Sequence, residues 1–159
     1  MALCTHLRVF ASTAQVGLPE TRLGILPGAG GTYRLPAVIG LTRARDLILT
    51  GRRVSGAEAY FLGLADRLVE VLPDEAKDGE EAQKDLLKRA NDEVLKEAVK
   101  LAADICTGGP IAIRSALNAV NWATEDVENS MYERVVGTED RNEALAAFRE
   151  KRKPNFKGR

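Results

Sequence analysis

The sequence predicts an α/β fold in which short strands come first and helices make up most of the rest of the chain. The first 26 residues contain two short β-type runs, 7–10 and 15–18, on either side of a turn at 11–13. A proline and several glycines break this pattern at 27–31. From residue 86 onward, apolar residues recur at helical intervals between glycine and proline breaks, which predicts a helical C-terminal half.

The composition limits the classes of partner. At 159 residues the chain is long enough for one domain with a modest core. Lysine plus arginine and aspartate plus glutamate both number 23, so charge gives no reason to expect nucleic acid or an anionic membrane as a partner. No run approaches the roughly 20 apolar residues of a membrane span. Cys4 and Cys106 match no metal or redox spacing, and we expect both to be reduced and buried.

Two helices are predicted after the glycine-rich break. The first covers 32–39 and contains Pro36, which should bend or interrupt it. The second covers 43–50, with Thr42 as its N-cap. A glycine follows each helix and should end it.

A third helix opens at Ser55, with Glu58 placed as its capping-box partner. Gly63 stands in the position after this helix and should end it. A strand is then expected over 64–72, although its alternation of apolar and polar residues is imperfect.

The composition changes at Pro73, so we divide the chain into 1–72 and 73–159. The polar segment 74–83 fits either a solvated loop or a frayed first turn. The helices expected beyond it are 86–105, 110–122, 126–136 and 139–150, with Pro110 well placed at a helix start. Trp122 and Phe148 are expected to serve packing rather than ligand contact.

Glu20 is the candidate acid/base residue. It is a single carboxylate in a run that is otherwise mostly apolar or glycine, just before the glycine-rich turn. An ionised side chain is expensive to bury unless it is paired. The alternative from spacing alone is a surface ion pair with Arg22 or Arg34.

The glycine-rich turn at 27–32 has two interpretations. Glycines let backbone N–H groups approach an anion, so the turn could cradle a phosphate. It lacks a Walker lysine and the Rossmann spacing, however. A tight turn that begins a helix and lines an acyl pocket is the favoured interpretation.

Five blocks in order resemble the crotonase (enoyl-CoA hydratase/isomerase) superfamily. They are Gly17-Leu-Pro-Glu20, Leu23-Gly-Ile-Leu-Pro-Gly-Ala-Gly-Gly-Thr32 with Arg34-Leu35, Ala44 to Thr50-Gly51, Ser55-Gly-Ala-Glu58-Ala59 to Gly63-Leu64-Ala65, and Thr138-Glu-Asp140-Arg141-Asn-Glu143 through Ala147-Phe148 to Pro154. Within the superfamily, Leu18-Pro-Glu-Thr21 and Ala11-Ser12 most resemble methylglutaconyl-CoA hydratases and short-chain enoyl-CoA hydratases.

The resemblance implies the C-terminal part of a crotonase-like spiral α/β fold, followed by a helical trimerisation region. It implies that Glu20 donates a proton to the α-carbon of an enoyl-CoA thioester. The substrate-binding residues that it implies are Pro19, Leu26, Pro27, Gly28, Lys151 and Phe156. Lys151 and Phe156 belong to the basic tail, residues 151–159. The alternative for this tail is a frayed segment that only makes the chain more soluble.

The resemblance also implies a homo-oligomer (a trimer or a dimer of trimers), a mitochondrial location and no metal or redox cofactor, since CoA is part of the substrate. Family members are longer, and their second glutamate and both oxyanion N–H donors would precede Met1. Losing one such donor alone typically lowers the rate about a hundredfold to a thousandfold. We therefore expect an N-terminally truncated chain that is a poor hydratase. Alternatives are an isomerase that uses Glu20 alone, or a non-catalytic paralogue that joins an oligomer.

Overall fold

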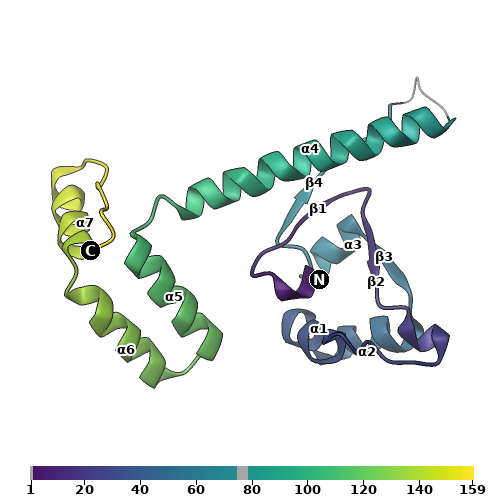
Figure 1. The fold of residues 1–159 in the computed structure, drawn as a ribbon, viewed down its shortest axis with the longest axis horizontal. Helices are drawn as coiled ribbons and strands as arrows, with labels where there is room; N and C mark the ends of the chain where they lie inside the picture. Colours follow the sequence, from purple (N-terminus) through teal and green to yellow (C-terminus); the bar gives the residue numbers. More distant parts are fainter. Residues whose placement is uncertain (1, 75–78) are drawn as a thin grey trace. The chain divides into compact units, whose positions relative to one another are not determined.

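The computed structural model describes residues 2–74 and 79–159 and divides the chain into two compact units, Met1–Ala98 and Val99–Arg159. The first unit contains η1 (Ala2–Cys4), β1 (Val9–Ala11), β2 (Gln15–Gly17), η2 (Glu20–Leu23), α1 (Gly31–Ile39), α2 (Leu41–Thr50), β3 (Arg53–Ser55), α3 (Gly56–Phe61), β4 (Arg67–Val69) and most of α4 (Gly79–Ile105) (Figure 1). The second contains α5 (Pro110–Trp122), α6 (Glu125–Val136) and α7 (Glu139–Glu150). The predicted α/β composition is confirmed, while the division at residue 72 stays a prediction.

Two small sheets organise the first unit. β1 pairs with β4 in parallel, with Phe10 opposite Leu68, and β2 pairs with β3 in antiparallel, with Val16 opposite Val54. Both N-terminal strands were predicted within one or two residues, whereas β3 was not predicted. The strand expected over 64–72 is only three residues long. The residues before it are instead held at the end of α3, since the N–H groups of Leu64 and Ala65 donate to the carbonyl of Ala59.

Gly40 joins α1 and α2 without an intervening loop. Its φ of 82° favours glycine, and it follows Ile39 and directly precedes Leu41. The prediction of Thr42 as N-cap is therefore wrong, because the helix has already begun at Leu41. Pro36 does not interrupt α1, which runs on to Ile39.

The core of the first unit collects apolar side chains from α1, α2, β3, α3 and the segment after α3. The buried members are Leu35, Ile39, Ala44, Leu47, Val54, Ala59, Leu64 and Ala65. A smaller cluster of Ala11, Val71 and Ala90 brings α4 against the β1 region. Burial of this apolar surface, rather than the very short strands, accounts for most of the stability of the unit.

The capping of α3 is confirmed in part. The Ser55 hydroxyl accepts a hydrogen bond from the N–H of Glu58 at 3.2 Å. The Glu58 carboxylate does not complete the capping box, because it pairs with Arg52 at 2.7 Å. Gly63 follows the helix with a φ of 82°, as predicted for a glycine after a helix end.

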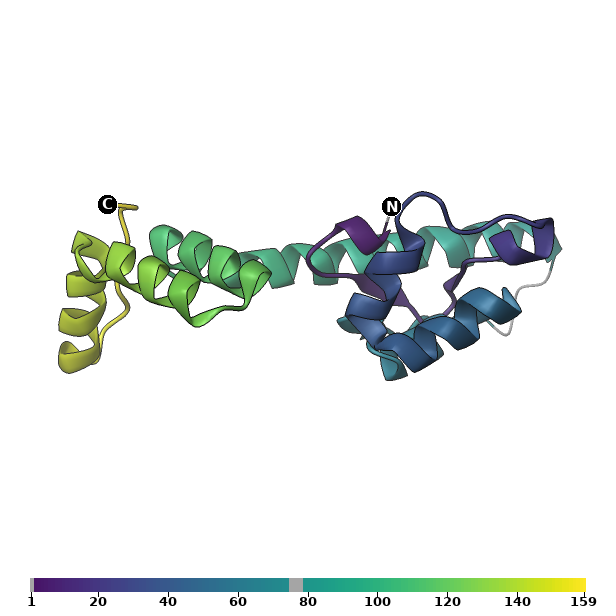
Figure 2. The same cartoon turned by 90° about the horizontal axis from the view of Figure 1, so that it is seen from below.

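The second unit is helical throughout its regular structure. α5 and α6 run side by side (Figures 1 and 2). Pro110 is the first residue of α5, and the Thr138 hydroxyl caps α7 by accepting from the N–H of Arg141 at 3.1 Å. α4 begins at Gly79, so residues 79–83 of the predicted loop or frayed turn are helical. Residues 75–78 of that segment lie outside the described residues.

Two expectations about burial are wrong. Cys4 and Cys106 are free, as expected for reduced thiols, but both are exposed, because each lies at the end of a helical segment on the surface. Trp122 and Phe148 are 73% and 84% exposed, so neither packs into the interior of its unit. No helix in the described ranges is long and apolar enough to cross a membrane.

Candidate functional site

Glu20 is the first residue of the short helical turn η2, and hydrogen bonds fix this turn on the end of α2. The Thr21 hydroxyl donates to the carbonyl of Ile48 at 2.8 Å, and Arg22 Nε donates to the carbonyl of Thr50 at 3.0 Å. Gly24 then ends the turn with a φ of 73°. The residues after Glu20 are therefore tethered, which holds its side chain at a defined place in the fold.

The Glu20 carboxylate has a buried oxygen without a partner. Among the described residues, Glu20 Oε2 is the one buried side-chain nitrogen or oxygen atom that makes no hydrogen bond. Neither arginine of the surface ion-pair alternative reaches it. Arg22 bonds to Thr50, and Arg34 donates to the carbonyl of Ala29 at 3.0 Å and lies over the Tyr33 ring. The surface ion pair is therefore absent, and neither arginine occupies the Glu20 carboxylate.

Three other carboxylates of the first unit, those of Asp46, Glu58 and Asp66, are paired with arginines. Asp46 and Glu58 both bind Arg52, at 2.8 Å and 2.7 Å. The hydrogen bonds of Arg52 to Glu58 and Asp46 raise the pKa of its guanidinium. Asp66 pairs with the buried Arg8 at 3.2 Å. These groups hold the fold together, which sets Glu20 apart from them.

A largely apolar cavity of about 520 Å³ lies next to the Glu20 turn. Leu18 and Pro19, the two residues before Glu20, line it together with Ala2, Leu3, Phe10, Gln15, Val16, Gly17, Leu35, Leu47, Arg53, Val54 and Leu64. Of the predicted substrate-binding residues, Pro19 is thus beside the cavity. Arg53 is a lining cation that the sequence did not single out, and it belongs to the unpredicted β3.

The glycine-rich turn leads directly into α1, as predicted. Pro27 is fully buried, and a Cβ atom added at Gly31 would lie 2.7 Å from the Cβ atom of Pro27, so only glycine allows this approach. Leu26 is 64% exposed and Gly28 is exposed as well. Neither lines the cavity, and their substrate-binding role stays a prediction.

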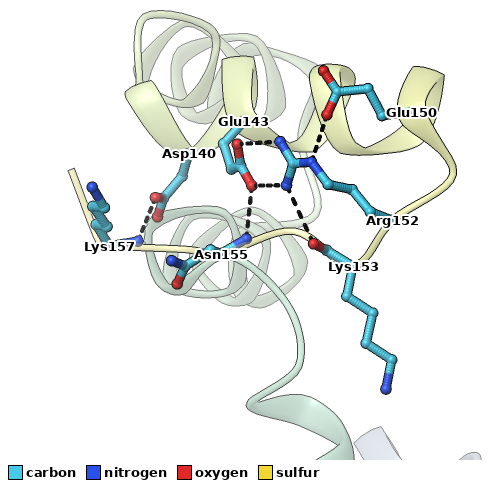
Figure 3. A network of polar contacts seen from close by, with 7 residues as sticks. All are labelled: Asp140, Glu143, Glu150, Arg152, Lys153, Asn155 and Lys157. Carbon is cyan, nitrogen blue, oxygen red and sulfur yellow. Dashed lines mark hydrogen bonds and ion pairs between the residues drawn. The ribbon is translucent and has the colours of Figure 1, made fainter.

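The basic tail of the second unit is fixed rather than frayed (Figure 3). The N–H groups of Lys157 and Gly158 donate to the two oxygens of Asp140 at 2.6 Å and 2.8 Å. Glu143 accepts from the N–H of Asn155 at 2.9 Å and forms a two-point ion pair with Arg152. The sequence showed these two acids only as part of a motif, so their role in holding the tail was missed.

The two predicted tail residues lie directly after α7 and between two residues that this network binds. Lys151 ends α7 with a φ of 53°, and its side chain is exposed. Phe156 is half-buried, and its ring would lie 3.6 Å from a Cβ atom added at Gly109.

The ion pair with Arg152 and the hydrogen bond from the N–H of Asn155 lower the pKa of the Glu143 carboxyl to about 2. Bonds to Glu143 and Glu150 raise the pKa of Arg152.

No group of three or more histidine, cysteine, aspartate or glutamate residues in the described part of the chain is placed to hold a metal ion. Of the predicted site residues, Glu20 and Pro19 lie together in the first unit, and Lys151 and Phe156 lie in the ordered tail of the second unit.

Comparison with known proteins gives a consistent result. The family model for enoyl-CoA hydratase/isomerase matches residues 1–84, more than half of the chain. The methylglutaconyl-CoA hydratase 1, mitochondrial, of Pyricularia oryzae is 68% identical over the whole chain, which covers 46% of that relative. An enoyl-CoA isomerase/hydratase of Zymoseptoria tritici is 62% identical, again over the whole chain and 50% of the relative.

Among solved structures, the enoyl-CoA hydratase of Bacillus anthracis matches 99% of the chain with a TM-score of 0.82 and 38% identity, and 56% of that structure is covered. This likeness confirms the predicted crotonase-like α/β fold. The chain spans about half the length of the relatives it matches. On the family model and these likenesses, the chain belongs to the enoyl-CoA hydratase/isomerase family.

Proposed function

We propose that this chain supplies Glu20 as the proton-transferring carboxylate for the hydration of 2-enoyl-CoA thioesters, with methylglutaconyl-CoA as the type of substrate. The observation that carries the proposal is the buried, unpartnered Oε2 atom of Glu20, a residue that directly follows two residues, Leu18 and Pro19, that line an apolar cavity. A protein leaves a buried carboxylate oxygen unsatisfied at a cost in stability, which makes functional use the favoured explanation. The names of the Pyricularia and Zymoseptoria relatives agree with this substrate class.

Hydration sets three chemical requirements. A base must activate the water, an acid must protonate the α-carbon, and hydrogen-bond donors must stabilise the enolate oxygen. Glu20 answers the second requirement. Asp46, Glu58 and Asp66 are occupied by arginines and are poor candidates for the first. We therefore expect the 159-residue chain alone to hydrate the thioester slowly. In its relatives, we expect the base and the enolate-stabilising donors to lie in the half that this chain does not match.

Isomerisation is the second candidate. Moving a double bond between the 3- and 2-positions needs one group that takes a proton from one carbon and returns it to another, so a single free carboxylate suffices. The observation that favours it is that Glu20 is unpartnered while Asp46, Glu58 and Asp66 are paired. A non-catalytic role, in which the chain joins an oligomer, is the third.

The proposal also covers cofactors, oligomeric state and location in the cell. The chemistry uses no metal or redox cofactor, because CoA is part of the substrate. Exposed apolar residues on the second unit, among them Val120, Trp122 and Phe148, support association with further copies, for which we propose a trimer or a dimer of trimers. The mitochondrial relatives support a mitochondrial location.

The test measures hydration of a 2-enoyl-CoA and isomerisation of a 3-enoyl-CoA by the chain, with deuterium incorporation at the α-carbon followed by mass spectrometry in heavy water. Glu20→Gln should lower the active reaction about 10²- to 10⁴-fold. Glu70→Gln, which changes an exposed acid of the same unit, is the matched control and should leave the rate unchanged. Hydration that survives Glu20→Gln would overturn the proposal. Activity on neither thioester would reject both enzymatic candidates for this chain.

A further inference from the structure

The second unit contains a small polar cavity that the proposed reaction does not use. Its volume is about 260 Å³, and it lies between the first turns of α5, the end of α6, the start of α7 and the fixed tail. The residues that line it are Ile111, Arg114, Ser115, Arg134, Thr138 and Gly158. All of them belong to the second unit, whereas Glu20 belongs to the first.

Two arginines face this cavity without a counter-ion. Within the described ranges, the guanidinium of Arg134 makes no hydrogen bond or ion pair. Arg114 uses only its Nε atom, which donates to the carbonyl of Pro110 at 3.2 Å, so its two terminal nitrogens are free. Two like charges that share a polar cavity repel each other, and an anion between them would remove that repulsion.

The acids near this cavity do not supply the anion. Asp140 uses its two oxygens to accept from the N–H groups of Lys157 and Gly158. Glu139 pairs with Arg159 at 2.9 Å. Asp140 holds the tail in place and, through Gly158, also holds one wall of the cavity, while Glu139 is occupied by its exposed ion pair with Arg159.

Hydroxyl groups complete the lining. Ser115 is only 3% exposed, and in the described part of the chain its hydroxyl has no hydrogen-bond partner. Thr138 donates its hydroxyl hydrogen to the carbonyl of Val135 at 2.8 Å. The cavity thus offers the guanidinium of Arg134, the two terminal nitrogens of Arg114 and one free hydroxyl donor. Arginine forks match the paired oxygens of a phosphoryl group, and such charge-assisted bonds are about twice as strong as neutral ones.

We propose that this cavity binds a phosphoryl anion, either inorganic phosphate or the phosphate group of a small ester. Arg114 and Arg134 hold the phosphoryl oxygens from α5 and α6, and the Ser115 hydroxyl donates a third hydrogen bond. The fixed tail closes the cavity from the side of Gly158. The volume exceeds that of one phosphate, which leaves room for the first atoms of an ester group.

The experiment is calorimetric titration of the 159-residue chain with inorganic phosphate, AMP and CoA at constant ionic strength. Arg114→Gln and Arg134→Gln should each weaken phosphate binding at least about tenfold, because each removes charge-assisted hydrogen bonds. The double variant should show no binding. Arg149→Gln is the matched control, because Arg149 is an exposed arginine of α7 that does not line the cavity. Tighter binding of AMP or CoA than of phosphate would identify the ligand as an ester.

Circular dichroism shows whether each variant keeps its helical content, and thermal melts give a second readout. Phosphate should raise the Tm of the unmodified chain above the value in sodium chloride of equal ionic strength, and it should not do so for the double variant. Absence of saturable binding by the unmodified chain would overturn the proposal. Binding retained by a folded double variant, or lost equally in Arg149→Gln, would also overturn it.

Discussion

Glu20 in the first unit and Asp140 in the second are both acids in the first turn of a helical element, and the fold treats them in opposite ways. Asp140 is 5% exposed, and its two oxygens each accept a backbone N–H group from the tail. Glu20 also has a buried oxygen, yet that oxygen has no donor. Satisfied buried acids are the rule in folded proteins, so the exception needs an explanation.

The difference separates an acid that serves stability, Asp140, from the acid that we propose for chemistry, Glu20. The chain supplies donors to a carboxylate where the tail is held, as at the buried Asp140 and the partly exposed Glu143. It supplies none at Glu20, although Arg22 and Arg34 are close in sequence and bond to carbonyl groups instead. The unsatisfied acid is therefore a specific feature of the first unit.

The largest effect on stability is expected at Asp140. Asp140→Ala removes the acceptor of two backbone N–H groups and should destabilise the second unit by about 2–4 kcal/mol. Asp140→Asn keeps one acceptor oxygen, so its stability should lie between that of Asp140→Ala and that of the unmodified chain. Urea unfolding gives the free energy, and hydrogen exchange at Lys157 and Gly158 shows whether the tail is released.

Glu139→Ala is the control for the Asp140 series, because it removes an exposed ion pair in the same turn and should change little. Equal effects of Glu139→Ala and Asp140→Ala would contradict the assignment of Asp140 as the acid that holds the tail.

The pH dependence of the tail should follow Glu143. Its pKa is lowered from 4.5 to about 2 in the folded chain, so its contribution is complete above the unfolded value and is lost as the pH falls from 4.5 toward 2. Protection of the Asn155 N–H should therefore be constant from neutral pH to about 5 and decline below that. Hydrogen exchange at a series of pH values measures it.

Glu143→Gln should remove the decline that Glu143 causes, because the amide does not titrate in this range. The variant should show weaker protection of Asn155 than the unmodified chain above about pH 5, and the difference should close as Glu143 of the unmodified chain becomes protonated. A decline of the same size in the variant would assign the effect to another acid.

Much of the helical structure could be predicted because its signals are local. The helix ends are marked by residues that stand within a few positions of them, such as Ser55, Gly63 and Pro110. The repeated apolar spacing is likewise a pattern within each helix. β3 was missed because its three residues are too few for their alternation to be recognised in the sequence, and the strand is defined by its pairing with β2. Thr42 was wrong because the positive φ of Gly40 sets the start of α2, and a backbone angle is not visible in a sequence.

The candidate sites also divide into one that local sequence signals reveal and others that depend on contacts between distant residues. Glu20 could be selected from the sequence, because its apolar and glycine-rich neighbours make a carboxylate unusual there. The fixed tail could not, since Asp140 reaches Lys157 and Gly158 across 17 and 18 residues. The cavity around Arg114 and Arg134 joins two helices and the tail, and no local pattern connects those residues.

The smallest effect should have the opposite sign and should come from Glu20. Glu20→Met keeps the length of the side chain and removes the unpartnered buried oxygen, so it should stabilise the chain by about 1 kcal/mol while abolishing proton transfer. Glu58→Met is the matched control, because it deletes an acid that is paired with Arg52 and should destabilise rather than stabilise. Thermal and urea unfolding of both variants give the comparison. A loss of stability in Glu20→Met would mean that the carboxylate has a stabilising partner in the folded chain. In that case Glu20 and Asp140 would be acids of one kind, and the buried oxygen of Glu20 would no longer indicate chemistry.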